Sequence, residues 1–430
     1  MTRLLAPLLA PLGHRAVALL WSGLALSAVG DYLYLIALSW IAVGVLGSAA
    51  GYLTALGAGT TLLVALVAGR WVDGFEQRRA MLAADLVRAA ALTAVVVPWL
   101  ALGHVSAAPL VAAVLVVAAG QAVFRPALQA MLPALVPTPA ELPAANGLFD
   151  ATDRIARLLG PGIVALLAAV VPAVHFLTLD AASFLGSAAA LTCIGRLHPT
   201  LALRRAGPAG GALAEVLRGF RAVRREPVLG FELAISGILN GAWSAAFFLG
   251  VPLVVARHHL LGPAGAGLGA YGLVISAYGC TNLLATFVVG GRPLPERPAG
   301  LLFSGGVVMG AGMLVMAAGI AAGLEGGALL AVLAAGAALG APGGPMHDIP
   351  VAVLRQTRLD RDDLPAAVRA SIASSSAGAL VAMLAAPALF AHVPEAAAMG
   401  LCGAVVLATG LAGLVRFVRP QPRGARRVVR

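Results

Sequence analysis

The chain contains no lysine, and charged residues of either sign make up only 11% of its 430 residues. Without lysine, the Gly-Lys-Ser/Thr string that holds nucleotide phosphates cannot occur, so ATP-driven work by this chain alone is not expected. A soluble domain carries roughly 25% charged residues. The shortage of charge therefore excludes an ordinary soluble protein, and the scattered histidines suggest no catalytic arrangement, so we do not expect an enzyme.

Cysteine is also scarce. Cys193, Cys280 and Cys402 lie far apart, each inside an apolar stretch. Their spacing fits neither a metal site nor a disulfide framework. We therefore expect no metal and no cofactor, and we interpret the three thiols as small apolar packing groups.

Apolar residues, in contrast, make up 60% of the chain, and the mean hydropathy is +0.95. A helix that crosses a bilayer needs about 20 mostly apolar residues, and stretches of that length recur along the whole chain without the alternation of barrel strands. The prediction is an all-α polytopic membrane protein whose twelve spans form two pseudo-symmetric six-helix bundles. The expected spans are 16–43, 50–72, 79–102, 106–131, 142–170, 173–196, 227–256, 265–290, 299–322, 326–353, 364–391 and 394–418.

The net charge is +11, and all of the positive charges counted in it are arginines. With the expected spans, nearly all arginines fall in the loops, tails or helix ends of one side; only Arg257 falls on the other, and Arg154 and Arg157 lie within the fifth span. Positive charge kept on one side of a membrane explains this placement better than nucleic-acid binding does. We expect a multi-pass protein of the cell inner membrane with both termini cytoplasmic.

The longest polar segment divides the twelve expected spans into two sets of six. Residues 1–196 form the predicted N-terminal bundle and 227–418 the C-terminal bundle. Residues 197–226 form a cytoplasmic central loop, whose apolar and basic residues alternate at helical spacing and indicate a short amphipathic helix. Residues 419–430 form a basic cytoplasmic tail.

The turn between the second and third spans carries the most specific motif. Gly69, Asp73, Arg78 and Arg79 match the signature of the major facilitator superfamily at this place, a glycine, an aspartate four residues on, and a closing arginine pair. Further strings narrow the resemblance to the branch of drug:proton antiporters that contains enterobactin exporters and macrolide-efflux proteins. These strings lie at 84–89, 124–127, 132–137, 144–146, 158–162 and 179–184.

The resemblance implies a cytoplasmic gate in which Asp73 pairs with the ends of facing helices, together with Gly69, Arg78 and Arg79. We add Asp85 and Arg88 to this gate as its continuation into the third span. The counterpart turn of the second half, 290–297, lacks the aspartate, so the first half is expected to carry most of the gating and coupling.

Ionisable groups inside a membrane are costly, and each is therefore a candidate functional residue. Asp31 lies near the middle of the first span, where it could load and release a proton or contact substrate; the alternative is a carboxylate paired with a buried arginine. Asp180, in the sixth span, has a structural or a coupling role. Asn240 and Asn282 could bind substrate or join helices by hydrogen bonds.

The fifth span holds Asp150, Asp153, Arg154 and Arg157, two pairs at i,i+4 spacing. They are expected to be buried pairs that neutralise each other or, alternatively, relay charge between the gate and the central cavity. Gly160, Pro161 and Gly162 follow, and they resemble the antiporter motif of helix five.

Taken together, the sequence predicts a secondary transporter, most simply a proton-coupled exporter of a moderately hydrophobic small molecule such as a drug, antibiotic or siderophore-like compound. The alternatives are an importer or a lipid or metabolite carrier of the same fold, or a membrane receptor that does not transport. Its expected partners are a small-molecule substrate, protons and the bilayer, without nucleic acid, and the chain is expected to be a monomer.

Overall fold

The computed structural model describes residues 10–67, 76–136, 138, 141–168, 170–197, 212–260, 267–292 and 294–418. The described part is helical and contains no strand. The N-terminal half comprises α2 (Arg15–Leu46), α3 (Ala50–Val67), α5 (Gln77–Leu102), α6 (Ala107–Leu135), α7 (Leu142–Leu167) and α8 (Ala173–Leu197). Short turns of 3₁₀ helix lie at η1 (Ala10–Gly13), η2 (Gly47–Ala49) and η5 (Arg361–Asp363).

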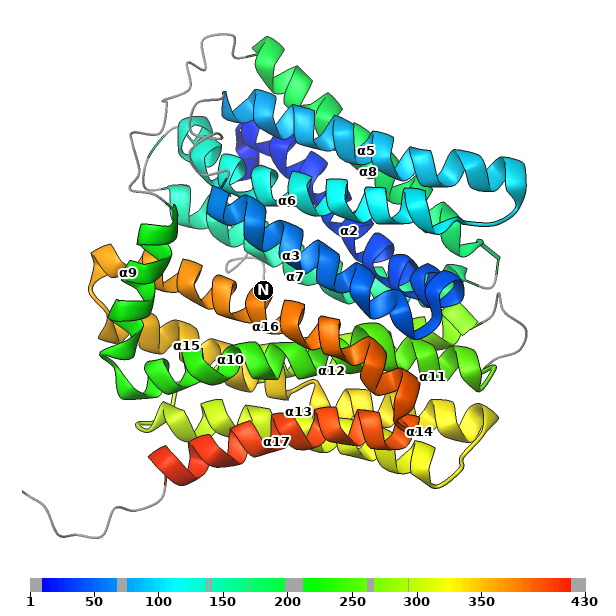
Figure 1. Ribbon diagram of the computed structural model, residues 1–430. Helices are drawn as coiled ribbons and strands as arrows, with labels where there is room; N and C mark the ends of the chain where they lie inside the picture. The colour runs from blue at the N-terminus through cyan, green and yellow to red at the C-terminus, as the bar shows by residue number, and fades with distance from the viewer. Residues whose placement is uncertain are drawn as a thin grey trace, which may run out of the picture.

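The C-terminal half repeats this arrangement with two broken spans. One is α10 (Pro227–Ala245), the π-helical segment η4 (Ala246–Gly250) and α11 (Val251–Arg257); the other is α14 (Gly326–Gly340) followed by α15 (Gly343–Arg358). The rest are α12 (Gly267–Gly290), α13 (Pro298–Ala321), α16 (Leu364–His392) and α17 (Glu395–Phe417). Figure 1 shows the two halves as stacked bundles with roughly parallel helix axes.

Ten stretches of the described chain are long and apolar enough to be membrane spans. One of them, Arg15–Val64, contains both α2 and α3, which turn back at Gly47, where φ is +57°. Helix α7 is not among the ten because it carries two aspartates and two arginines, yet it packs between α2 and α12 inside the bundle. The described chain therefore has twelve membrane-crossing segments, and the predicted fold class is confirmed.

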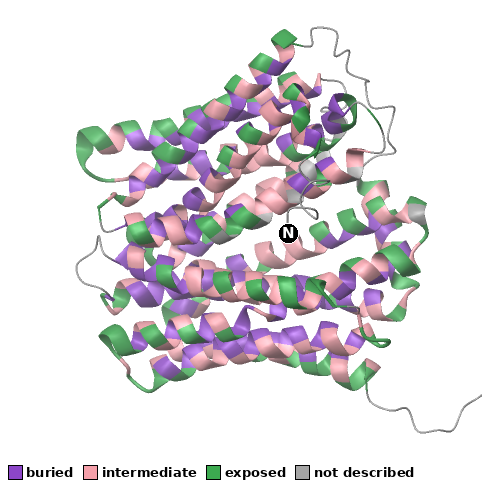
Figure 2. Cartoon of the chain, turned by 180° about the vertical axis from the view of Figure 1, so that it is seen from behind, coloured by how far each residue is buried: buried purple, intermediate pink, exposed green. Residues whose placement is uncertain are grey.

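Buried residues line the helix faces that meet inside each half, and exposed residues lie mostly on the outer surface of the bundle (Figure 2). This pattern follows from solvation: in lipid each helix satisfies its own backbone hydrogen bonds, and its apolar outer face contacts lipid tails. In the N-terminal half α2 packs on α8 and α7, and α5 packs on α6 and α8. In the C-terminal half α13 packs on α17, and α10 on α16.

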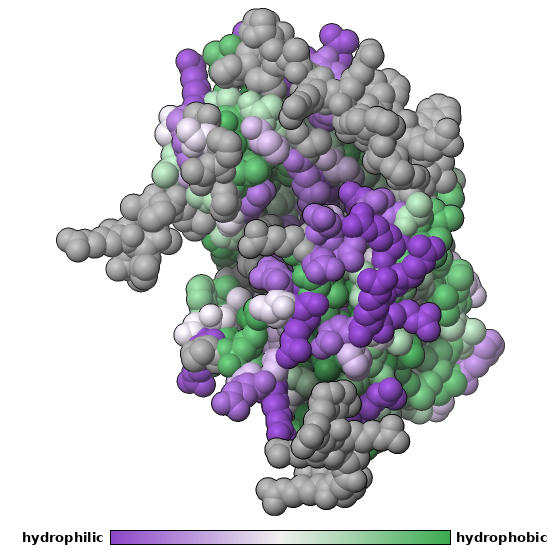
Figure 3. Space-filling model, turned by 90° about the vertical axis from the view of Figure 1, so that its left-hand side faces the viewer, coloured by the Kyte–Doolittle hydropathy of each residue, from purple (hydrophilic) through white to green (hydrophobic). Residues whose placement is uncertain are grey.

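One end of the bundle carries the start of α2, the amphipathic helix α9 (Ala212–Arg224) and the end of α17 (Figure 1). We call it the basic end because it bears Arg78, Arg218, Arg355, Arg369 and Arg416, and hydrophilic side chains gather on it (Figure 3). Helix α9 packs on α10 and α16. Its Arg218 lies 2.8 Å from Asp363, and its Glu215 lies 3.3 Å from Arg369, so α9 is fastened to the C-terminal half.

The apolar core is continuous across both halves at the opposite end and divided at the basic end. At the opposite end one cluster joins residues of α2, α5 and α8 to residues of α10, α12 and α17. At the basic end each half has a separate cluster. Close contacts between the halves agree: Gly267 lies against Trp40, and Gly272 against Ala165. The halves are therefore closed together at the end away from the basic end.

Candidate functional site

A central cavity of about 770 Å³ lies between the two halves. Ligand pockets of roughly 300–1,000 Å³ hold drug-sized molecules, so the cavity has the size of a substrate site. Its walls come from α2 and α7 of the first half and from α10, α12 and α15 of the second. The lining includes Ala352, Val353 and Gln356 near the end of α15, so the cavity extends toward the basic end.

The second half gives the cavity an aromatic wall. Trp243 stacks on Phe247 with ring centroids 5.2 Å apart, and it meets Phe248 edge-on at the same separation. Tyr278 from α12 packs against both Trp243 and Phe247. The π-helical turn η4 places Phe247 and Phe248 on this wall. Such rings offer large, rigid contact surfaces to apolar or aromatic ligands.

Asn240 and Asn282, the two predicted amides, both line the cavity. The Asn240 side chain donates to the carbonyl oxygen of Ser375 at 3.0 Å, and the Asn282 side chain donates to that of Ala341 at 3.0 Å. Ala341 lies at the break between α14 and α15. Each amide therefore joins two helices by a hydrogen bond, as one of the two predicted roles requires. The other role, substrate binding, stays a prediction.

The first half contributes an ion pair to the cavity wall. Asp153 accepts a hydrogen bond from Arg157 at 3.3 Å, and Arg157 also donates to the Tyr32 hydroxyl at 2.9 Å. The predicted i,i+4 pair is present, but it is not buried as expected: the Arg157 side chain is 61% exposed and that of Asp153 is 33% exposed. Nothing is described of the side chains of the other predicted pair, Asp150 and Arg154.

Asp31 lines a separate, smaller pocket of about 190 Å³ inside the N-terminal half. Arg88, Gln121 and Arg125 also line this pocket, and Asp153 lines both this pocket and the central cavity. Arg125 lies 3.6 Å from Asp153. Asp31 is therefore next to the substrate-sized space without belonging to its wall, with Asp153 between the two.

Asp180 lies beside Asp31 and is fully buried. Its side chain accepts a hydrogen bond from Ser183 at 3.0 Å. The Gly30 backbone lies directly against Asp180 and Ser183, and a Cβ at position 30 would overlap both side chains. The absence of a side chain at Gly30 thus lets α2 and α8 bring the two carboxyl groups together.

Asp85 and Arg88, predicted to continue the gate into the third span, lie on α5. They form an ion pair in the core of the N-terminal half, with side chains 0% and 1% exposed. Arg88 donates to Gln121 at 2.8 Å and lies over the ring of Phe184 at 4.1 Å. At a rise of 1.5 Å per residue, Asp85 is about 10 Å along α5 from the gate arginine at 78. The pair lies beside Asp31 in the N-terminal half, and its predicted part in the gate stays a prediction because Gly69 and Asp73 lie outside the described residues.

Of the predicted gate, Gly69 and Asp73 lie outside the described residues. The two arginines share Glu76: Arg78 lies 3.0 Å and Arg79 lies 2.6 Å from its carboxylate oxygens. Arg78 also packs against Gly195 of α8. Glu76 was not among the predicted gate residues, although it lies two positions before the arginine pair in the sequence.

The Gly160-Pro161-Gly162 motif lies within α7, where it meets α2. A Cβ at Gly160 would come within 2.5 Å of the Tyr32 Cβ, so glycine allows the close approach there. Pro161 lines the central cavity, whereas Gly162 has no neighbour within 4 Å. One glycine of the motif therefore serves helix packing, and the proline faces the substrate-sized space.

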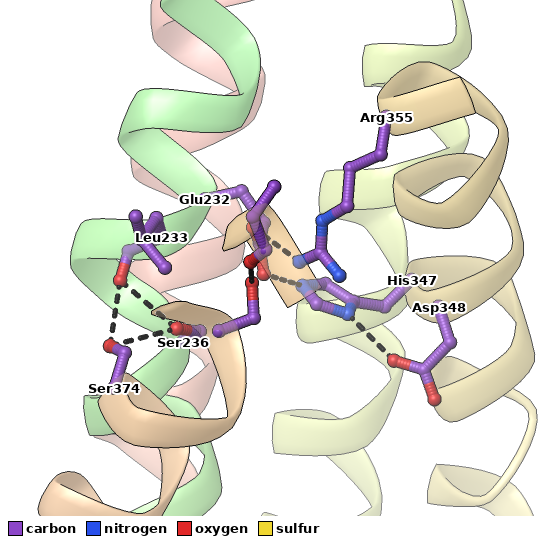
Figure 4. A network of polar contacts seen from close by, with 9 residues as sticks. Glu232, Leu233, Ser236, His347, Asp348, Arg355 and Ser374 are labelled. Carbon is purple, nitrogen blue, oxygen red and sulfur yellow. Dashed lines mark hydrogen bonds and ion pairs between the residues drawn. The ribbon is translucent and has the colours of Figure 1, made fainter. Parts of the chain in front are cut away.

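A polar cluster in the second half was missed as a site. Glu232 of α10 lies 3.3 Å from Arg355 and 3.9 Å from His347, both on α15 (Figure 4). Glu232 is more than 100 positions away from His347 and Arg355 in the chain, so sequence spacing could not bring it together with them. The available signals were a glutamate inside a span and a histidine directly after the broken helix.

Two six-helix halves with a cavity of about 770 Å³ between them make up the described fold. The sequence model of the Major Facilitator Superfamily matches residues 20–362. The chain belongs to this superfamily, a family of transporters and not of enzymes, and the predicted resemblance is confirmed. It is a multi-pass membrane protein.

Curated relatives include multidrug efflux pumps named Tap. The pump of Mycolicibacterium fortuitum is 32% identical over 210 residues, which cover 47% of this chain and 51% of that protein. The pump of Mycobacterium tuberculosis H37Rv is 31% identical over 204 residues, 45% of this chain and 48% of that protein. The chain thus spans about half the length of the curated relatives it matches.

Solved structures with the same fold include an auto inhibited POT family peptide transporter, with a TM-score of 0.71 and 13% identity over 96% of this chain and 99% of that one. A bacterial homologue of the iron transporter ferroportin in an inward-facing state has a TM-score of 0.67 and 14% identity, covering 94% of this chain and 98% of that one. At such identities these structures support the fold alone.

Proposed function

We propose that this chain is a proton-coupled exporter of moderately hydrophobic small molecules that works by alternating access. The observation that carries the proposal is the central cavity with its aromatic wall, placed next to a buried carboxylate cluster. The similarity to multidrug efflux pumps supports export over import. The cytoplasmic assignment of the basic end rests on the arginine distribution, and in this conformation the cavity would then face the cytoplasm.

The charge balance of the N-terminal cluster supports proton coupling. Asp31, Asp85 and Asp180 lie around one fully buried guanidinium, that of Arg88. Three carboxylates against one cation leave uncompensated negative charge inside the membrane, which is costly. Binding of protons relieves the imbalance. A second arginine that lines this pocket, Arg125, is paired with Asp153 at the pocket edge. This ion pair connects the cluster to the cavity wall.

The test uses proteoliposomes with an imposed pH gradient, ethidium as the fluorescent probe and a pH-sensitive dye to follow protons. Wild type should move ethidium in exchange for protons, and Asp31→Asn should lower this exchange at least tenfold because the carboxyl can no longer release a proton. Asp360→Asn, an exposed loop carboxylate at the basic end, is the matched control. Unchanged exchange in Asp31→Asn would contradict the assigned role.

The same assay separates the alternatives. Probe movement down the proton gradient in the same direction as the protons would identify an importer. If neither ethidium nor a broad drug panel moved in either direction, while the protein remained folded, the reading as a receptor that does not transport would replace the proposal.

A further inference from the structure

The proposed mechanism assigns no role to the polar cluster of the second half, which is formed by Glu232, His347 and Arg355. Glu232 is 2% exposed and His347 is 8% exposed, both inside the membrane-crossing part of the bundle. The Glu232 carboxylate lies 3.3 Å from Arg355 through Oε2, while its Oε1 faces His347 Nε2 at 3.9 Å. Charged and titratable groups in such a place are expensive to keep, and the packing of α10 against α15 brings three of them together.

His347 lies between a buried group and an exposed one. Its Nδ1 is 3.1 Å from Asp348 Oδ1, and the Asp348 side chain is 78% exposed and lines the central cavity (Figure 4). Its Nε2 points toward Glu232 and has no hydrogen-bond partner among the described residues. A buried ring nitrogen without a partner is costly, and it faces an acceptor just beyond hydrogen-bond reach.

We propose that Glu232, His347 and Asp348 form a second proton site, a relay that carries a proton between the central cavity and Glu232. This inference rests on the proposed proton-coupled transport and locates part of the coupling in the second half. A proton arriving on Asp348 passes to His347 Nδ1, and the proton on Nε2 then passes to Glu232. The imidazole ends neutral with its hydrogen on the other nitrogen, and one proton has moved from the cavity into the protein.

The 3.9 Å gap exceeds the hydrogen-bond range, so the relay is interrupted in the present conformation. His347 lies on α15, directly after the break at Ala341 and Pro342. A broken helix can shift its second segment without unfolding, and broken helices often mark the transport path. Small movements of α15 against α10 would close the gap, which ties proton transfer to the change of access.

Among the residues that the structure describes, the charged groups acting on Glu232 are those of α15. From α15 it meets Arg355, His347 and, beyond the imidazole, Asp348. From α16 the nearby polar group is the Ser374 hydroxyl, which is bonded to Ser236 and to the Leu233 carbonyl. A structural reading, in which Glu232 and Arg355 only fasten α10 to α15, leaves the partnerless nitrogen of His347 unexplained.

The experiment reads conformation against pH and needs no substrate. Gly269 at the closed end faces Ala168, and a Cβ there would lie 3.8 Å away, an ordinary contact. A cysteine at position 269, in a background with Cys193, Cys280 and Cys402 replaced by alanine, reports opening of that end. Labelling rates with a membrane-impermeant maleimide are measured in nanodiscs from pH 5 to pH 9, after correction for the maleimide's own pH dependence.

Wild type should change its labelling at least threefold across this range. Asp31→Asn should keep part of the change, and adding His347→Gln or Glu232→Gln should abolish the remainder. His392→Gln and Glu325→Gln, exposed residues outside the cluster, are the matched controls. Size-exclusion profiles establish that each variant is folded.

Three results would overturn the inference. If Asp31→Asn alone flattens the profile, the second site is absent while the proposed coupling through Asp31 stands. If His347→Gln and Glu232→Gln change the labelling rate by the same factor at every pH, the cluster only holds α10 against α15. If wild type itself shows no change, proton coupling as a whole fails, and the second site fails with it.

Discussion

Replacing Arg88 by methionine should destabilise the N-terminal half strongly, because it leaves the Asp85 carboxylate buried without its partner. Both side chains are at most 1% exposed. Breaking a buried pair by removing one member costs about 3–5 kcal/mol, and Gln121 loses a donor at 2.8 Å as well. Since these terms overlap, we take about 4 kcal/mol, close to a thousandfold change in the folded population.

The assay is unfolding by sodium dodecyl sulfate in mixed micelles, followed by tryptophan fluorescence. The same helix offers a matched control, Arg79→Met: Arg79 pairs with Glu76 at i,i+3, but its side chain is 75% exposed. That pair should be worth less than about 1 kcal/mol. The double variant with Asp85→Asn and Arg88→Met should recover at least half of the loss, because the carboxylate that Arg88 contacts directly is then replaced by an uncharged amide.

Two outcomes would refute this reasoning. One is a cost for Arg88→Met within about 1 kcal/mol of that for Arg79→Met, which would mean that water or lipid headgroups reach the pair. The other is a double variant as unstable as the single one, which would show that packing of the guanidinium on Phe184 (4.1 Å) outweighs its charge.

Three further predictions follow from close contacts. Gly30→Ala should lower the yield of folded protein severely, since its Cβ would overlap neighbouring side chains of α8. Gly162→Ala is the matched control, because a Cβ there would meet nothing within 4 Å. It should be neutral or up to about 1 kcal/mol stabilising in the micelle titration. Asn282→Leu should cost about 1–3 kcal/mol, because the Ala341 carbonyl at the helix break loses its donor; an unchanged titration would show another donor. Arg218→Ala should change stability by less than about 1 kcal/mol but speed proteolysis around α9, since its 2.8 Å ion pair is lost; an unchanged cleavage rate would mean that packing alone holds α9.

The sequence predicted the spans well because membrane insertion is a local property of each segment. Helix α7 is instructive, since it carries four charges and fails a plain hydropathy test, yet its i,i+4 spacing and its place in the series identified it. What local patterns could not supply was the lateral partner of each charge. Arg88 was assigned to the gate because it follows the turn, but its neighbours Gln121 and Phe184 come from α6 and α8, and only packing decides that.

The second half shows the same limit more sharply. Glu232, His347 and Arg355 were each visible as polar residues in or near apolar spans, but their meeting depends on how α10 crosses α15. The degraded turn at 290–297 had suggested that coupling chemistry belongs mainly to the first half. A buried carboxylate with a histidine beside it argues against such a one-sided division, since these groups are costly in lipid and need a reason to persist.

Asp153 is the residue through which a substrate would act on the N-terminal cluster. It lines both the central cavity and the pocket of Asp31, and it shares its carboxylate between Arg157 at 3.3 Å and Arg125 at 3.6 Å. A cationic ligand in the cavity would compete with Arg157 for this carboxylate and weaken its hold on Arg125. Arg125 would then be free to turn toward Asp31 and favour loss of its proton. Under the proposed mechanism, this geometry would link substrate binding to proton release, and Asp153→Asn should uncouple the two while leaving Asp31 in place.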